Sequence, residues 1–357
     1  MAAARLRRLW LKLHRWVGLS LGMLLLISAT TGTLLIVGEP IDEALRPDLH
    51  RAQQAGDGRL DPVLARLRAE FGDDAGFTFR PPREPDETLH VFVSGPWTGT
   101  LFIDPSTGTE RGRLGQTEGF FNTVFALHST LLAHEAGRAA LALSALAYLL
   151  LLATGLVLWW PKWWRHALTV KTGSGLTRSL FDLHRVAGAL TGIVVLVSIV
   201  TGAYMAWRPI SAGVSAVAGS TPVKPPVITE PVDQALATVD AAMAVARQRV
   251  PDGMVGYVQV PARGTQPLRI RYRVPDDPHP NGLTSVWMHP GTLQVLAVNR
   301  WNELDTGTRA YSWIYPLHIG ELGGRATWLL TLLSGLALAW MGVSGTWLWW
   351  RRRCARG

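Results

Sequence analysis

The sequence predicts a membrane protein with an all-α core of four transmembrane helices, made by an internal parallel duplication, and two extracytoplasmic α+β domains. Three observations predict this fold: four long apolar runs, a repeated Leu-His-Arg tripeptide, and two polar segments, one inside each pair of runs. A helix needs about 20 mainly apolar residues to cross a bilayer. The four runs reach this length and cover residues 17–37, 139–160, 186–207 and 326–350.

Basic residues predict the orientation of these helices. They cluster before the first run, between the second and third runs, and after the fourth, and the positive-inside rule makes these regions cytoplasmic. The net charge of +9 therefore reports topology: a lipid bilayer is the expected partner, and nucleic acid is not. The clusters are Arg5, Arg7, Arg8, Lys12 and Arg15; Lys162, Arg165, Lys171, Arg178 and Arg185; and Arg351, Arg352 and Arg353.

The runs and charges together predict the domain order. It is transmembrane helix 1 with a cytoplasmic N-terminus (1–38), an extracytoplasmic domain (39–123), transmembrane helix 2 (124–164), a cytoplasmic loop (165–185), transmembrane helix 3 (186–207), a second extracytoplasmic domain (208–314), and transmembrane helix 4 with a cytoplasmic C-terminus (315–357). Each extracytoplasmic domain is expected to begin with a helix, at 62–71 and 232–250. Strands are expected at 88–93, 99–104, 256–260, 268–274 and 285–289.

The duplication is marked by histidines at fixed places. Leu13-His14-Arg15 and Leu183-His184-Arg185 each precede an apolar run, and in both copies the glycine of a Thr-Gly pair follows 18 residues after the histidine. His128 and His318 each lie 32 residues before the second residue of a double tryptophan. Parallel repeats are related by an axis along the membrane normal. We therefore expect His14 opposite His184 near the cytoplasmic face, and His128 opposite His318 near the outer face.

Facing histidines inside a helix bundle can ligate the iron of a b-type haem. Two pairs predict two molecules of haem b, with His14, His184, His128 and His318 as iron ligands. One above the other, the haems would give an electron path across the membrane. The alternative is four interfacial histidines that hydrogen-bond to the backbone, because duplication alone would also preserve their positions.

Glycines and arginines near the histidines complete the predicted haem sites. Glycines four and eight residues after a histidine share its helix face and leave room for a macrocycle, although Gly-x-x-x-Gly is also a common packing motif between membrane helices. The arginines could pair with haem propionates; for Arg15 and Arg185 a positive-inside or snorkelling role is favoured. The predicted residues are Gly18, Gly22, Gly188, Gly192, Arg15, Arg185, Arg138 and Arg325.

The distance from His128 to Trp160 poses a geometric problem. A straight helix of this length would extend about 48 Å at about 1.5 Å per residue, whereas the hydrocarbon core is about 30 Å thick. Either the outer haem lies above the bilayer, or the helices break near Gly137 and near Gly323-Gly324.

The chain resembles the PepSY-associated transmembrane family, iron-regulated inner-membrane proteins that include siderophore-iron reductases. The chain departs from the family pattern at His134, where a small residue is expected, and in the shortened turn before Arg325. The residues that carry the resemblance are Leu13-His-Arg-x-x-Gly18, Leu183-His-Arg-x-x-Gly188, Leu127-His-Ser-Thr-Leu-Leu132, Glu135-Ala-Gly-Arg138, Pro316-Leu-His318 and the Asp104-Pro-Ser-Thr-Gly108 turn.

The resemblance implies PepSY-like outer domains and a multi-pass protein of the bacterial inner membrane. It points to a ferric siderophore, or another periplasmic iron chelate, as electron acceptor, and to a separate cytoplasmic electron donor. The favoured function is therefore a b-type dihaem protein that reduces a periplasmic ferric siderophore. The alternatives are a haem-free PepSY protein that regulates an envelope peptidase, and a siderophore or iron permease component, which the almost entirely apolar midplane disfavours.

Overall fold

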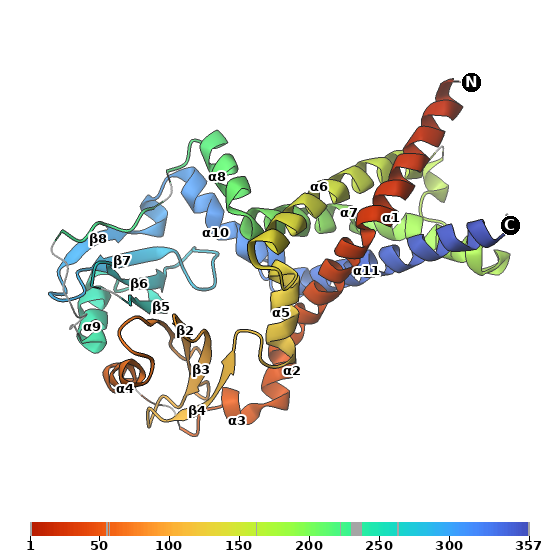
Figure 1. The fold of residues 1–357 in the computed structure, drawn as a ribbon. Coiled ribbons are helices and arrows are strands. Elements are labelled where there is room, and N and C mark those ends of the chain that lie inside the picture. The colour runs from red at the N-terminus through yellow and green to blue at the C-terminus, as the bar shows by residue number, and fades with distance from the viewer. Residues whose placement is uncertain are drawn as a thin grey trace. The chain divides into compact units, whose positions relative to one another are not determined.

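The computed structural model divides the chain into two compact units (Figure 1). The membrane unit consists of Met1–Gly38, Val124–Gly213 and Leu317–Gly357, and the sheet unit consists of Glu39–Thr123 and Val214–Pro316. Two sequence predictions fall partly outside the described part of the chain: the basic residue Lys162 and the start of the helix expected at 232–250. The structure describes residues 2–54, 56, 58–161, 163–221, 223–229, 238–262 and 264–355.

Four helices of the membrane unit are long and apolar enough to cross a membrane, as the sequence predicted. Each of α1 and α7 packs against both α6 and α11, so the bundle runs in the order α1, α6, α7, α11. A small apolar cluster of Leu25, Tyr148 and Val195 joins three of these helices. The four helices are α1 (Ala2–Ile36), α6 (His134–Trp159), α7 (Leu176–Ala206) and α11 (Arg325–Cys354).

The helices that carry His128 and His318 are separate from the long helices that follow them. α5 (Phe120–Thr130) ends before α6, and α10 (Thr306–Ile319) ends before α11. The two predicted spans at 124–164 and 315–357 are therefore each broken, which removes the problem of their excess length. α7, in contrast, begins within the segment predicted as a cytoplasmic loop (165–185), so that His184 is helical.

The two breaks are built from different residues. The α10–α11 connection places Gly320 (φ 81°) and Gly324 (φ 65°) in the left-handed region, where glycine carries no steric cost. The α5–α6 connection places Leu131 (φ 49°), Leu132 (φ 57°) and His134 (φ 48°) in the same region. A side chain with a Cβ is strained there, so the α5–α6 connection stores strain that the α10–α11 connection avoids.

The sheet unit contains one eight-stranded antiparallel sheet with the order β4-β3-β2-β1-β5-β6-β7-β8. The central pairing joins β1 to β5, with Thr78 opposite Gln259. The strands are β1 (Gly76–Arg80), β2 (Leu89–Ser94), β3 (Gly99–Ile103), β4 (Glu110–Gly115), β5 (Met254–Val260), β6 (Leu268–Arg273), β7 (Thr284–Met288) and β8 (Val295–Asn299).

The sequence had predicted that the two polar segments form two separate domains. In the structure they form one. They share a sheet and a single hydrophobic core, to which α4 (Asp61–Phe71) and α9 (Val239–Arg249) both contribute. The two helices also cap each other. Asp61 Oδ1 accepts from Val239 N (2.5 Å), and Asp240 Oδ1 accepts from Leu60 N (2.8 Å), which supplies partners for free N–H groups at both helix N-termini.

Most elements of the sheet unit match the sequence prediction. The helices expected at 62–71 and 232–250 correspond to α4 and α9, and the five expected strands to β2, β3, β5, β6 and β7. Strands β1, β4 and β8 were not predicted. The remaining helices are α2 (Gly38–Leu45), α3 (Pro47–His50), α8 (Arg208–Val217) and the short 3-10 helices Trp164–His166, Thr172–Ser174 and Trp301–Glu303.

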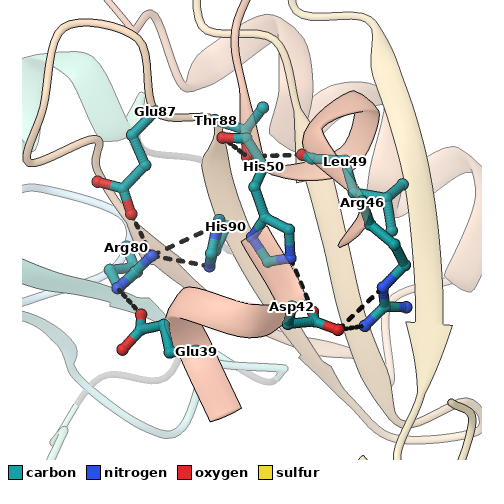
Figure 2. Close-up of polar contacts among 9 residues, drawn as sticks. All are labelled: Glu39, Asp42, Arg46, Leu49, His50, Arg80, Glu87, Thr88 and His90. Carbon is teal, nitrogen blue, oxygen red and sulfur yellow. Dashed lines mark hydrogen bonds and ion pairs between the residues drawn. The ribbon is translucent and has the colours of Figure 1, made fainter. Parts of the chain in front are cut away.

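A polar network attaches α2 and α3 to the sheet (Figure 2). Arg80 of β1 pairs with Glu39 of α2 (3.8 Å), and Thr88 Oγ1 donates to Leu49 O of α3 (2.9 Å). His50 Nε2 bonds Asp42 Oδ2 (2.8 Å), and the Arg80 guanidinium also contacts Glu87 and the His90 ring, with 3.0 Å from Nη2 to Nδ1. Arginine can only donate, so His90 accepts with an unprotonated nitrogen. Burial, and then the charge of Arg80, lower the pKa of His90 well below its usual value. His90 is therefore a neutral part of this attachment.

The strained α5–α6 connection predicts an unusual stabilising substitution. His134→Gly should raise the free energy of unfolding by about 0.5–1 kcal/mol, because relief of left-handed strain exceeds the entropy that glycine loses on folding. Ala133→Gly is the matched control: Ala133 has φ −123°, so glycine there should destabilise by a similar amount. Thermal unfolding in detergent would measure both. Shifts of the same sign in the two variants would contradict the strain argument.

Candidate functional site

The structure brings the four predicted histidines together as two pairs in the membrane unit. The ring centres of His14 on α1 and His184 on α7 lie 6.4 Å apart, with an angle of 85° between the ring planes. The ring centres of His128 on α5 and His318 on α10 lie 6.1 Å apart, with an angle of 42°. The pairs are those that the repeat symmetry predicted.

In the first pair, each ring hydrogen-bonds through Nδ1 to a hydroxyl on a neighbouring helix. His14 Nδ1 lies 2.8 Å from Thr154 Oγ1 of α6, and His184 Nδ1 lies 3.1 Å from Ser344 Oγ of α11. Both hydroxyl groups donate their own proton to a backbone carbonyl one turn earlier in their helix. Each oxygen therefore accepts from the imidazole, and Nδ1 carries the ring proton.

The second pair follows the same rule, with a carbonyl as an additional acceptor. His128 Nδ1 lies 3.1 Å from Ser28 O and 3.1 Å from Thr31 Oγ1. His318 Nδ1 lies 2.8 Å from Ser198 O and 3.3 Å from Thr201 Oγ1. A carbonyl can only accept, so Nδ1 must be protonated. Nε2 of a neutral imidazole then carries the lone pair, which is the state in which histidine binds a metal.

A glycine follows each of these hydroxyl residues and makes room for the ring. A Cβ added at Gly32 would lie 2.9 Å from His128 Cε1, and one at Gly202 would lie 2.8 Å from His318 Cε1. The corresponding distances are 3.4 Å from Gly155 to His14 Cε1 and 3.3 Å from Gly345 to His184 Cε1. Each histidine therefore lies against a Thr-Gly or Ser-Gly pair of an adjacent helix.

These roles were not among the predictions from sequence, although the signal is present in the sequence. Thr31-Gly32 and Thr201-Gly202 had a predicted role only as the end of each repeat. Thr154-Gly155 and Ser344-Gly345 both come five and six residues before the second residue of a double tryptophan. A hydroxyl residue followed by glycine thus recurs at matched positions in both halves.

The glycines predicted from sequence to lie beside the haem contact other residues than the histidines. Gly18, Gly188 and Gly192 face Leu151, Met341 and Leu152 respectively, with added-Cβ distances of 3.7, 3.2 and 2.8 Å. An added Cβ at Gly22 meets nothing within 4 Å. Helix packing, the alternative role for these glycines, therefore describes Gly188 and Gly192 best, while Gly22 lies beside open space.

The four predicted arginines have different surroundings. Arg185 donates to Ala167 O (2.9 Å) and Thr169 O (2.8 Å), so it fastens the connection before α7. Arg138 forms an exposed ion pair with Glu135, at 2.6 Å. Arg15 follows His14 on α1 and is half-buried, whereas Arg325 is exposed at the first residue of α11. A structural role thus accounts for Arg185, although Arg15 and Arg185 each directly follow a histidine of the first pair.

Each histidine pair fits a metal ion whose remaining ligands come from a bound cofactor. Two imidazole nitrogens that shared one metal, each about 2 Å from it, would hold the ring centres no more than about 6 Å apart, close to both observed separations. Two histidines supply two ligands, and within the described residues no group of three or more His, Cys, Asp or Glu side chains is placed to hold an ion. An iron macrocycle such as haem, which supplies the remaining ligands, matches this donor set.

These features define a multi-pass membrane protein with paired histidines at two positions along its helix bundle. The family profile described as PepSY-associated TM region matches residues 11–352. The chain therefore belongs to the PepSY-associated transmembrane family, as the resemblance had indicated. Among curated proteins no match to the chain is found.

The contacts between glycines and histidine rings predict which glycines cannot be replaced by alanine without loss of stability. Gly32→Ala and Gly202→Ala should each lower the free energy of unfolding by about 1–3 kcal/mol, because the new methyl group displaces a packed ring. Gly22→Ala on α1 is the matched control and should be neutral or slightly stabilising, since alanine favours the helix. Thermal unfolding in detergent would measure the three variants. Equal effects at all three positions would contradict the assignment.

Proposed function

We propose that the chain is a b-type dihaem electron-transfer protein of the bacterial inner membrane, which reduces a periplasmic ferric siderophore or similar iron chelate with electrons from the cytoplasm. One observation carries this proposal: two facing histidine pairs, each with its Nδ1 proton held by a neighbouring helix and Nε2 left for a metal. When bound, haem would supply reversible one-electron chemistry at iron.

The spacing of the pairs along the bundle supports a path across the membrane. Thr31, which contacts His128, lies on α1 together with His14, and the two residues are 17 positions apart. This corresponds to about 26 Å along the helix axis, close to the hydrocarbon thickness of about 30 Å. The two pairs are therefore suited to two haems, one near each face of the membrane.

The chain's own residues would hold and tune these groups. A ligand histidine whose second nitrogen donates a hydrogen bond is fixed in orientation and becomes a stronger ligand. The hydroxyl and carbonyl acceptors at Thr154, Ser344, Ser28 and Ser198 would have this role. The apolar layer of Leu25, Tyr148 and Val195 would exclude water between the two levels.

We further infer the topology from the charge distribution. Both termini and the connection before α7 would be cytoplasmic, with the sheet unit in the periplasm and a separate cytoplasmic protein as electron donor. The matching sites in the two halves support an internal parallel duplication, and each half would contribute a PepSY-like lobe to the shared sheet. Hard oxygen ligands suit Fe(III) better than Fe(II). Reduction alone would therefore loosen the chelated iron, without a catalytic acid or base.

The first test is the haem content of the detergent-purified protein. We expect two b-type haems per chain by visible spectra, oxidised and dithionite-reduced, and by pyridine haemochrome. His184→Ala and His318→Ala should each lose one haem, and the double variant both, because each substitution removes one of the two histidines that would hold that haem. The exposed His166→Ala should keep both. Absence of a Soret band after expression with ample haem would refute the proposal and favour a haem-free regulator of an envelope peptidase.

The hydroxyl acceptors give a second, finer test. Thr154→Val and Ser344→Ala remove the partner of the Nδ1 proton but leave the ligands in place, and should weaken haem binding about 10- to 100-fold, the usual cost of losing such a partner. Thr346→Val is the control, because in the described part of the chain its hydroxyl donates to Gly342 O of its own helix (2.9 Å) and not to a histidine. Haem release to apomyoglobin would be followed for each variant. Unchanged release rates in Thr154→Val and Ser344→Ala would contradict the assigned role.

A further inference from the structure

The face of the sheet opposite α4 and α9 carries a row of arginines and aromatic residues. Leu268, Ile270 and Tyr272 of β6 point into the core, so the alternate residues of that strand lie on the opposite face. We call this region the arginine face. It is formed by Arg269 and Arg271 of β6, Tyr257 and Gln259 of β5, and Ser285 and Trp287 of β7.

Strand register sets these side chains next to one another. Arg269 lies opposite Gln259 on one side and Trp287 on the other, whereas Arg271 lies between Tyr257 and Ser285. Cross-strand neighbours on one face are close enough to interact. The two guanidinium groups are therefore flanked by aromatic and neutral polar side chains.

Arg269 is held rigidly by neutral partners. Its guanidinium carbon lies 4.6 Å from the centre of the Trp287 ring. Nε and Nη2 donate to Ser285 Oγ at 3.0 and 2.8 Å, and Nη1 donates to Gln259 Oε1 at 3.4 Å. A guanidinium has five N–H donors, so these contacts orient the group and still leave donors for a ligand.

Arg271 has the same kind of environment. Its guanidinium carbon lies 5.5 Å from the centre of the Tyr257 ring, and Nε donates to Gly282 O at 3.1 Å. Tyr257 also meets Phe92 of β2 edge to face, with ring centres 6.1 Å apart. Phe92 is 37% exposed, so aromatic surface next to the arginine face is open to a ligand.

Within the described residues no carboxylate is paired with Arg269, whereas the charge of the buried Asp277 acts on Arg271. The contacts of Arg269 and Arg271 are with neutral oxygens. Burial, and next the charge of Arg271, lower the pKa of Arg269 to about 10. The positive charge of the arginines also acts on the neighbouring His279. Burial, and then the charges of Arg271 and Arg273, lower the pKa of His279 to about 4. The buried Asp277 accepts from the backbone of His279 and Leu283.

Charged groups that are removed from water are normally paired. Asp277 offsets part of the charge of Arg271, but the two adjacent half-buried guanidinium groups repel each other and share this one carboxylate, which is costly unless a further anion joins them. Guanidinium binds carboxylate-like oxygens through two parallel hydrogen bonds, and it stacks on aromatic planes. The arginine face therefore has the chemistry of a site for an anion with paired oxygens and aromatic rings.

We propose that the arginine face binds an anionic ferric chelate of the catecholate class. A tris-catecholate complex is strongly negative, carries paired oxygens, and presents aromatic rings that can pack on Tyr257 and Phe92. Ferric trihydroxamates lack both the negative charge and the aromatic rings. The proposal rests on the proposed function in taking iron as the chelated metal; binding itself requires no haem.

The test is calorimetric titration of the full chain in detergent with the gallium(III) complex of a tricatecholate chelator, which is redox-inert. We expect saturable binding, weakened at least about tenfold by Arg269→Gln and by Arg271→Gln through loss of charged hydrogen bonds. Arg273→Gln is the matched control on the same face of β6: Arg273 is exposed and contacts Asp277 O (3.3 Å). It should change the affinity less than about twofold.

Several outcomes would overturn the proposal. They are no binding by the wild-type chain, equal loss in Arg273→Gln, and equal affinity for the gallium(III) complex of a trihydroxamate. Arg269→Lys keeps the charge without the planar fork and should bind with intermediate affinity, and its unfolding temperature separates lost binding from lost folding. Haem content is measured on the same samples. Binding without haem would refute the electron-transfer proposal alone, and haem without binding would refute this one alone.

Discussion

The hydrogen bond from histidine Nδ1 to an adjacent helix is the interaction on which the membrane unit depends. A buried imidazole that lost this acceptor would leave an unsatisfied donor in an apolar bundle, at a cost of about 1–3 kcal/mol. The bond also fixes the tautomer, and so decides which nitrogen is available to a metal. Its geometry requires close approach, which explains why a glycine accompanies each hydroxyl, and the bonds of His14 and His184 join α1 to α6 and α7 to α11.

The membrane unit was largely predictable because its signals are local. Apolar length identified four helices, and equal spacing identified which histidines face each other. The excess length after His128 had left two alternatives, an outer haem above the bilayer or a break in the helix, and the structure contains the break. The glycine contacts were missed because Gly18 was placed from its position on the helix of His14, whereas the His14 ring meets Gly155 of another helix. Sequence spacing orders residues along one helix and says little about which residue of a neighbour lies opposite.

The sheet unit was less predictable because its decisive contacts are distant in sequence. Strands with clear alternation were found, but β1 is five residues long and its identity as a strand depends on β5, far along the chain. The reciprocal caps of Asp61 and Asp240 are likewise invisible without the fold. The polar segments each looked like a domain since each has its own helix and strands; only the pairing of β1 with β5 reveals that neither sheet half is closed alone.

That central pairing has a consequence for biosynthesis. β1 is made long before β5, and two membrane helices, α6 and α7, must be inserted between them. During this interval the inner edge of β1 has no partner strand, and an open edge can pair with any other extended chain. Completion of the sheet must therefore await the last third of the polypeptide. The nascent first lobe is the stage at which a chaperone would protect the chain, and a product truncated before β5 would be prone to aggregate.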